Sequence, residues 1–180
     1  MGFRPVVTVY ESCSGMMKRL IRAGYQIADV MTVMRAVGDV PSKESAIVVG
    51  PASSVENWSR AYLSAFYGDL GLMPVVTKIV RRLKGSDATT LLEARLGGQV
   101  CGVLAIYRSS ELAGVYCVGT VQRFRGRGVA EALLVGARQI ASSEGRTLFL
   151  QTLRSEGTEE YYVRRGFRVL YRKVLMRKKG

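Results

Sequence analysis

The segment Arg123–Gly128 carries three arginines and two glycines in six positions, directly before apolar residues at helical spacing. The first turn of a helix leaves about four backbone N–H groups without partners, and glycine lets an anion approach them because it has no Cβ. Arginine side chains hold phosphate oxygens in bidentate geometry. These residues predict a pyrophosphate-binding loop. Their spacing alone leaves a solvated basic loop or a nucleic-acid contact open as alternatives.

Other chemistry is excluded by residues that the chain lacks. The Walker pattern GxxxxGK[ST] and the dinucleotide pattern GxGxxG are both absent. The chain has no histidine, which removes Ser-His triads and the common zinc sites. The three cysteines, Cys13, Cys101 and Cys117, do not have the spacing of metal ligands. We therefore predict no metal site and expect reduced thiols in a cytoplasmic protein.

Positive charge is concentrated in the last third of the chain. The net charge is +13, and residues 121–180 hold 14 Lys and Arg against 5 Asp and Glu. This distribution favours a polyphosphorylated ligand or a nucleic acid as a partner. No apolar run approaches the roughly 18–20 residues that span a bilayer, so no membrane partner is expected.

The pattern from residue 45 onward predicts an α/β domain with a mixed sheet. A Ser53–Glu56 capping box is expected to start one helix, and Lys84-Gly85 to end a second. Gly97-Gly98 is expected to join two strands in a hairpin. The expected strands are residues 45–50, 89–96, 99–107, 112–122, 147–153 and 168–176, and two further helices follow Gly128 and Thr158.

The first 44 residues predict a strand (5–11), a helix (14–24) and another strand (25–34). They match the C-terminus at an offset of 142 residues, with low identity. The identical pairs are Gly15–Gly157, Arg22–Arg164, Gly24–Gly166, Met34–Met176 and Arg35–Arg177. Two interpretations stay open, because any strand–helix–strand unit looks similar, whereas an internal repeat would make the N-terminus the remnant of a second copy. We predict a division into residues 1–44 and 45–180.

The stretch VGTVQRFRGRGVAEALL resembles the acetyl-CoA-binding motif of the GCN5-related N-acetyltransferases (GNAT superfamily), Q/R-x-x-G-x-G/A. The register Arg125-x-x-Gly128-x-Ala130 is preferred over one starting at Arg123, because it opens the helix at Gly128. The later stretch EEYYVRRGF is similar to the penultimate helix of that family. The resemblance implies a mixed, largely antiparallel twisted sheet flanked by helices, with the N-terminal β-α-β unit as an appendage.

The resemblance also implies site residues and acetyl-CoA as cosubstrate. Tyr162 matches the tyrosine that faces the thioester sulfur, and Ser155 stands where the family often has an asparagine that touches the cofactor. The implied cofactor-binding residues are Val118, Gly119, Thr120, Arg125, Gly126, Arg127, Gly128, Val129, Ala130 and Ser155.

The implied activity is N-acetyl transfer by direct attack of a primary amine on acetyl-CoA, with a small-molecule or peptide amine as acceptor. The base is Glu93, Glu111, Asp69 or a water molecule, and each carboxylate is expected at the surface. A non-catalytic acetyl-CoA-binding module is the alternative, and a basic nucleic-acid-associated protein is the less favoured one. A homodimer is left open.

Overall fold

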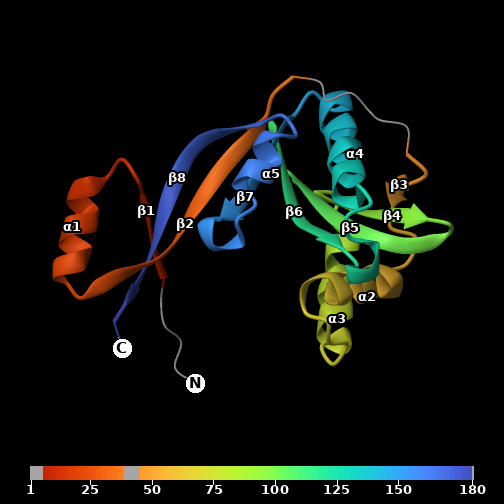
Figure 1. Cartoon of the computed structure of the whole chain (residues 1–180), viewed down its shortest axis with the longest axis horizontal. Coiled ribbons are helices and arrows are strands. Elements are labelled where there is room, and N and C mark those ends of the chain that lie inside the picture. The colour runs from red at the N-terminus through yellow and green to blue at the C-terminus, as the bar shows by residue number, and fades with distance from the viewer. Residues whose placement is uncertain (1–5, 39–44, 180) are drawn as a thin grey trace. The chain divides into compact units, whose positions relative to one another are not determined.

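The computed structural model describes residues 6–38 and 45–179 (Figure 1). Its contacts divide the chain into two compact units, residues 1–39 with 150–180 and residues 40–149. Strand β7 (Thr147–Leu153) begins in the second of these units and ends in the first. Among the described residues, no helix is long and apolar enough to cross a membrane.

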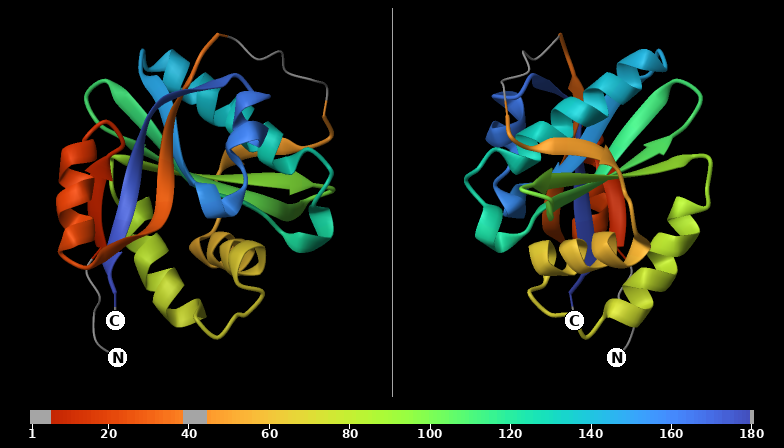
Figure 2. Two further views of the ribbon diagram at one scale, coloured as in Figure 1. Left: turned by 60° about the vertical axis from the view of Figure 1, so that its left-hand side comes forward. Right: turned by 90° about the vertical axis from the view of Figure 1, so that its right-hand side faces the viewer.

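The unit of residues 40–149 is an antiparallel sheet between two layers of helices. Its strand order is β3-β4-β5-β6, with the first residues of β7 beyond β6. Helices α2 and α3 lie on one face of the strands and α4 lies on the other (Figures 1 and 2). The elements are β3 (Val48–Pro51), α2 (Val55–Phe66), α3 (Met73–Lys84), β4 (Thr89–Leu96), β5 (Gln99–Arg108), β6 (Leu112–Thr120) and α4 (Val129–Ser143). The predicted α/β class and element order are confirmed.

Local sequence signals account for most ends of these elements. Gly97 and Gly98 have φ values of 56° and 77°, as the tight turn between β4 and β5 requires. The predicted capping box was wrong by one residue, because the N-cap of α2 is Ser54, whose Oγ accepts a hydrogen bond from the Asn57 N–H at 3.1 Å. The Ser53 hydroxyl instead accepts from Arg95 Nη2 at 2.8 Å.

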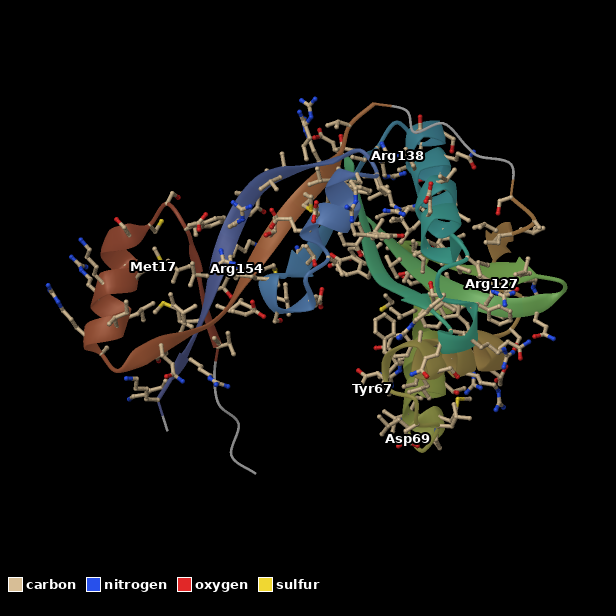
Figure 3. The ribbon with its side chains drawn as sticks, in the orientation of Figure 1. Met17, Tyr67, Asp69, Arg127, Arg138 and Arg154 are labelled. Atoms are coloured by element: carbon tan, nitrogen blue, oxygen red, sulfur yellow. The ribbon has the colours of Figure 1, made fainter. Side chains whose placement is uncertain are left out.

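The other unit is built around the longest strand pair of the chain. Strand β2 (Tyr25–Ala36) pairs antiparallel with β8 (Phe167–Lys178) along its whole length. Strand β1 (Val6–Tyr10) pairs with the opposite edge of β8, and α1 (Ser14–Arg22) connects β1 to β2. Figure 3 shows Met17 on α1, and its side chain packs against the cluster of Val9, Val174 and Met176.

The predicted N-terminal strand–helix–strand is therefore present, but the compact units do not divide at residue 44. Both neighbours of β8 in this unit come from the first 36 residues, so the two ends of the chain share one core. Residues 39–44, where the predicted division lies, are outside the described residues. The repeat origin of the N-terminal segment stays a prediction here.

Deleting residues 1–40 is expected to destabilise the chain severely. The deletion exposes both edges of β8, together with core residues Val174 and Met176, which are 4% and 0% exposed. Losing several core contacts costs more than the roughly 2–5 kcal/mol of one large-to-alanine change. Scanning calorimetry is expected to show a Tm lower by more than about 10 °C or no cooperative transition. Lys18→Ala on the exposed side of α1 is the control. An unchanged Tm and an unchanged sedimentation coefficient in the deletion variant would contradict this.

Candidate functional site

The backbone of the predicted anion loop leads directly into the N-terminus of α4 through two glycines in left-handed conformation. Gly126 and Gly128 have φ values of 76° and 80°, the left-handed region that favours glycine. A Cβ at either position would meet nothing within 4 Å, so the backbone conformation selects glycine and the available space does not. Gly128 is the N-cap of α4, as the preferred register predicts, and the first helical bond runs from the Ala132 N–H to the Gly128 carbonyl at 2.9 Å.

The first N–H groups of α4, at Val129 and Ala130, therefore have no acceptor within the helix. The helix dipole adds partial positive charge at the same place. Val129 is buried and anchors the helix start, whereas Gly126, Arg127 and Gly128 are exposed. The arrangement presents backbone donors to solvent on a fixed support, which is what a phosphate group needs.

The three arginines of this segment have different partners. Arg123 Nη2 donates to Gln99 Oε1 at 3.2 Å. Arg125 Nη2 donates to the Ala65 carbonyl at 3.0 Å, at the C-terminal end of α2. The exposed guanidinium of Arg127 lies 5.8 Å from the centre of the Phe124 ring (Figure 3). Arg125 thus ties the loop to α2, and Arg127 is placed at the surface of the loop itself.

Strand β6 is interrupted just before this loop. In its register with β5, Val103 faces Gly119 and Ala105 faces Tyr116, so that Cys117 and Val118 together oppose the single residue Leu104. This is a β-bulge, which leaves an extra residue outside the ladder. Cys117 has φ of 55° and is the one non-glycine with positive φ among the described residues. The bulge takes backbone groups beside Val118 out of β-sheet pairing, where the resemblance places pantetheine.

Packing of α2 on β6 explains why residue 119 is glycine. A Cβ there would lie 2.7 Å from the Phe66 ring and 2.9 Å from Ala65 Cβ. Real Cβ atoms do not approach so closely, so only glycine lets the end of α2 pack on β6. The residue predicted to touch the cofactor therefore also sets the distance between the helix and the strand.

An aromatic cluster that was not predicted as part of the site lies at the end of α2. The Tyr62 ring is 5.6 Å from Trp58, 5.0 Å from Phe66 and 5.9 Å from Tyr67. Burial, a hydrogen bond with Tyr67 and the neighbouring Cys117 raise the pKa of Tyr62. Burial also raises the pKa of the Cys117 thiol, which keeps it a weak nucleophile. The four-residue spacing of Trp58, Tyr62 and Phe66, which places the three rings on one face of a helix, was the feature of the sequence that could have predicted this cluster.

The three carboxylates considered as bases differ in their surroundings. Asp69 and Glu111 are exposed, and Asp69 Oδ1 accepts from the Gly71 N–H at 2.8 Å in the α2–α3 connection (Figure 3). The expectation of a surface position was wrong for Glu93, which is 3% exposed. Its Oε1 accepts from Arg95 Nε at 2.8 Å, and its buried Oε2 has no partner among the described residues. Packing of β4 inside the sheet, which its sequence alone does not reveal, buries this side chain.

Ser155 and Tyr162 belong to the other unit. The N–H and Oγ of Ser155 donate to the two oxygens of Asp29, at 3.3 and 2.5 Å. The hydrogen bond from the Ser155 hydroxyl, followed by one from the Val30 N–H, lowers the pKa of Asp29. The Ser155 hydroxyl is thus engaged by β2, a contact that no spacing in the sequence indicates.

Tyr162 lies in α5 (Glu159–Val163), directly before the turn at Gly166. Its ring centre lies 5.4 Å from that of Tyr161 and 5.9 Å from that of Phe167, in edge-to-face geometry. Burial, with smaller contributions from Tyr161 and Glu156, raises the pKa of Tyr162 to about 12. The phenol therefore keeps its proton at neutral pH and is able to donate a hydrogen bond.

Replacing Ser155 with alanine is expected to leave the acetyl-CoA Kd within about twofold, because a hydroxyl already bonded to a carboxylate contributes little to a new ligand. The pKa of Asp29 is expected to rise toward its ordinary value. Since the folded-state pKa is lowered, the stabilising contribution of Asp29 is present above the unfolded pKa and is lost as the pH falls through the folded one. Carboxyl NMR titration checks the shift, with Asp29→Asn as the matched control. A tenfold weaker acetyl-CoA affinity, an effect of about 1.4 kcal/mol, would show that Ser155 contacts the cofactor.

The comparisons with known proteins bear on the family and the fold of the chain. The acetyltransferase (GNAT) family matches residues 52–167. No curated protein matches the sequence. A GCN5-related N-acetyltransferase from Sphaerobacter thermophilus is 22% identical with a TM-score of 0.79, over 97% of this chain and 60% of its own. A putative acetyltransferase of the GNAT family from Novosphingobium aromaticivorans is 22% identical with a TM-score of 0.62, over 87% of this chain and 69% of its own. A tandem GNAT protein from the clavulanic acid biosynthesis pathway is 12% identical with a TM-score of 0.73, over 96% of this chain and 62% of its own.

Proposed function

Because this chain belongs to the acetyltransferase (GNAT) family, we propose that it transfers the acetyl group of acetyl-CoA to a primary amine. The observation that supports this most is the exposed loop at the start of α4, where Gly126 and Gly128 adopt left-handed conformations. The chain spans 60% of the length of the Sphaerobacter protein, and the activity is proposed for the residues of this chain alone.

In this proposal the pyrophosphate of the cofactor binds the N–H groups from Gly126 to Ala130. Arg127 supplies counter-charge from the surface of the loop, and Arg125 holds the loop against the end of α2. Pantetheine follows residues Val118–Thr120, the first of which lies in the bulge, while Gly119 and Thr120 stay paired with β5. Glycines at 126 and 128 keep side chains from standing between the phosphates and these donors.

The acceptor amine must be uncharged before it can attack. An ammonium loses its proton more easily in apolar surroundings, because desolvation disfavours the charged form. The cluster of Trp58, Tyr62, Phe66 and Tyr67 beside Cys117 offers aromatic ring surface next to the proposed thioester position. Trp58 is buried, whereas Phe66 and Tyr67 are 49% and 58% exposed, so an acceptor can reach their rings. We propose this cluster as the acceptor side of the site, with the amine proton passing to water.

The reaction then balances without a metal. The amine nitrogen forms a bond to the acetyl carbon, the C–S bond breaks and the electron pair leaves on sulfur as the CoA thiolate. The amide nitrogen loses a proton to water, and the thiolate gains one. In the family, the tyrosine that Tyr162 matches faces the thioester sulfur. A phenol whose pKa is about 12 stabilises the leaving thiolate by donating a hydrogen bond to it.

Turnover of acetyl-CoA with a panel of amines tests the proposal. The panel contains small primary amines and peptides with a free N-terminus or a lysine, and the readouts are thiol release and the mass of the acetylated product. Amine-dependent release with a stoichiometric product is expected. CoA binding by calorimetry without any product would instead identify a non-catalytic acetyl-CoA-binding module. Salt-dependent nucleic-acid binding without CoA binding would identify the basic nucleic-acid-associated alternative.

A further inference from the structure

The two ends of the chain repeat one structural unit at an offset of 142 residues. Strand β2, residues 25–36, falls on β8, residues 167–178, from end to end. Strand β1, residues 6–10, falls inside β7. Gly24 and Gly166, which precede the equivalent strands, both have left-handed φ values, of 85° and 73°.

Hydrogen bonds and irregularities of the β2–β8 pair repeat in the same way. The Val37 N–H donates to the Gly166 carbonyl at 2.8 Å, and the Lys179 N–H donates to the Gly24 carbonyl at 2.9 Å. The two bonds are equivalent, because the offset of 142 relates the donors Val37 and Lys179 and the acceptors Gly24 and Gly166. The register skips Ala28 in β2 and Leu170 in β8, which are again equivalent.

The pair Met31–Lys173 lies at the centre of this exchange, because the offset maps each member onto the other. Such a pattern is a local two-fold axis between β2 and β8. Two unrelated strand–helix–strand units would have no reason to share the position of a bulge and of a terminal bond. Of the two interpretations that the sequence left open, this favours an internal repeat.

The two copies differ in what happens at their outer strands. In the C-terminal copy, Leu148, Leu150 and Thr152 of β7 are 2–3% exposed. Their equivalents in β1 are Val6, Thr8 and Tyr10, which are exposed, with values of 55% for Val6 and 54% for Tyr10. The same face of the same strand is therefore covered in one copy and open in the other.

The outer edges differ as well. The edge of β7 has a neighbour in β6, since the Thr147 N–H donates to the Glu111 carbonyl at 3.0 Å. Strand β1 is the last in the order, and within residues 6–38 and 45–179 no strand pairs with its outer edge. The Glu11 N–H donates to Arg172 of β8, so that by alternation the N–H groups of Thr8 and Tyr10 face away from β8.

We propose that the outer edge of β1, together with the face of Val6, Thr8 and Tyr10, docks a second acetyltransferase-type core that lacks its own equivalent of β7 and supplies its β6-type strand parallel to β1. The repeat defines the occupant, because β6 is the strand that fills the equivalent edge of β7. A second copy of this chain has no free β6 to offer, since its own β7 already pairs with that strand. Main-chain hydrogen bonds and burial of an apolar strand face are the usual means of such docking.

A peptide of the β6 sequence tests the proposal on the full chain. The probe is residues 111–121 with serine in place of Cys117, and the measurement is NMR amide exchange of the protein at increasing peptide concentration. Saturable binding is expected to slow exchange at Thr8 and Tyr10 by about tenfold or more, with little change at Val9. A spin label at the peptide N-terminus is expected to broaden Val6 more than Tyr10, because the strands run parallel. A scrambled peptide is expected to have no effect.

Thr8→Pro removes an outward N–H without touching a bond to β8, and it is expected to abolish peptide binding while the Tm changes little. If that variant does not fold, Val6→Lys places a charge on the open face and serves the same purpose. Absence of protection at Thr8 and Tyr10 would overturn the proposal. Equal protection of the edge strand β3 would do so too, because it would show unspecific strand addition. Sedimentation of a dimer that Thr8→Pro dissociates would assign the surface to a second copy of this chain instead.

Discussion

Replacing Tyr162 with phenylalanine is expected to lower kcat by about ten- to a thousand-fold, the range up to that known for losing one oxyanion donor. The acetyl-CoA Kd and the Tm are expected to change little, because the ring and its contacts with Tyr161 and Phe167 remain. Burial raises the pKa of this phenol to about 12, which favours hydrogen-bond donation over full proton transfer. Full proton transfer to a thiolate whose conjugate acid has a pKa near 8.5 would be uphill by about 5 kcal/mol. Stabilisation of the developing thiolate by a hydrogen bond has no such cost.

Burial thus shifts the pKa of this phenol away from the value that a general acid would need. The control is Tyr161→Phe, which removes the hydroxyl of the adjacent tyrosine in the same helix. Its kcat is expected to stay within about threefold of the wild type, since the resemblance assigns the contact with the thioester sulfur to Tyr162 and not to Tyr161. Unchanged turnover in Tyr162→Phe together with a lower Tm would show that Tyr162 is a packing residue.

Replacing Gly128 with glutamate is expected to weaken CoA binding by more than about a hundredfold, through a carboxylate beside the phosphates and strain at a positive φ. Two matched variants separate these causes. Gly128→Asn tolerates the left-handed conformation and is expected to keep the Kd within about threefold. Gly128→Gln has the size of glutamate without its charge and is expected to lie in between. A clash with the protein itself plays no part, because a Cβ at this position meets no protein atom within 4 Å.

Isothermal calorimetry with CoA measures these affinities, and the Tm of each variant without ligand controls for folding. CoA added to the wild type is expected to raise its Tm, since a ligand that binds only the folded state stabilises it. That shift is expected to disappear in Gly128→Glu. The same Kd for CoA in Gly128→Glu as in the wild type would show that the phosphates do not bind at this loop.

Features set by a few consecutive residues could be predicted from the sequence. Paired glycines at 97 and 98 require a tight turn, and Gly128 before an apolar stripe starts a helix, because each depends on backbone conformation within one or two turns. The order of strands and helices and the anion loop follow from such local preferences. The repeat at an offset of 142 residues was visible for the same reason, since it preserves local patterns in both copies.

Tertiary structure alone decided the partners of side chains that are distant in the sequence. Arg125 binds the Ala65 carbonyl, Ser155 binds Asp29, and the Phe66 ring leaves no room for a side chain at Gly119. These contacts join residues about 50 to 130 positions apart, and closing such loops is compensated only by the packing of the whole unit. Local preference cannot specify that packing. The sequence therefore predicted the loop that we propose for phosphate binding, whereas the fold determined that Arg125 of this loop is bonded to α2.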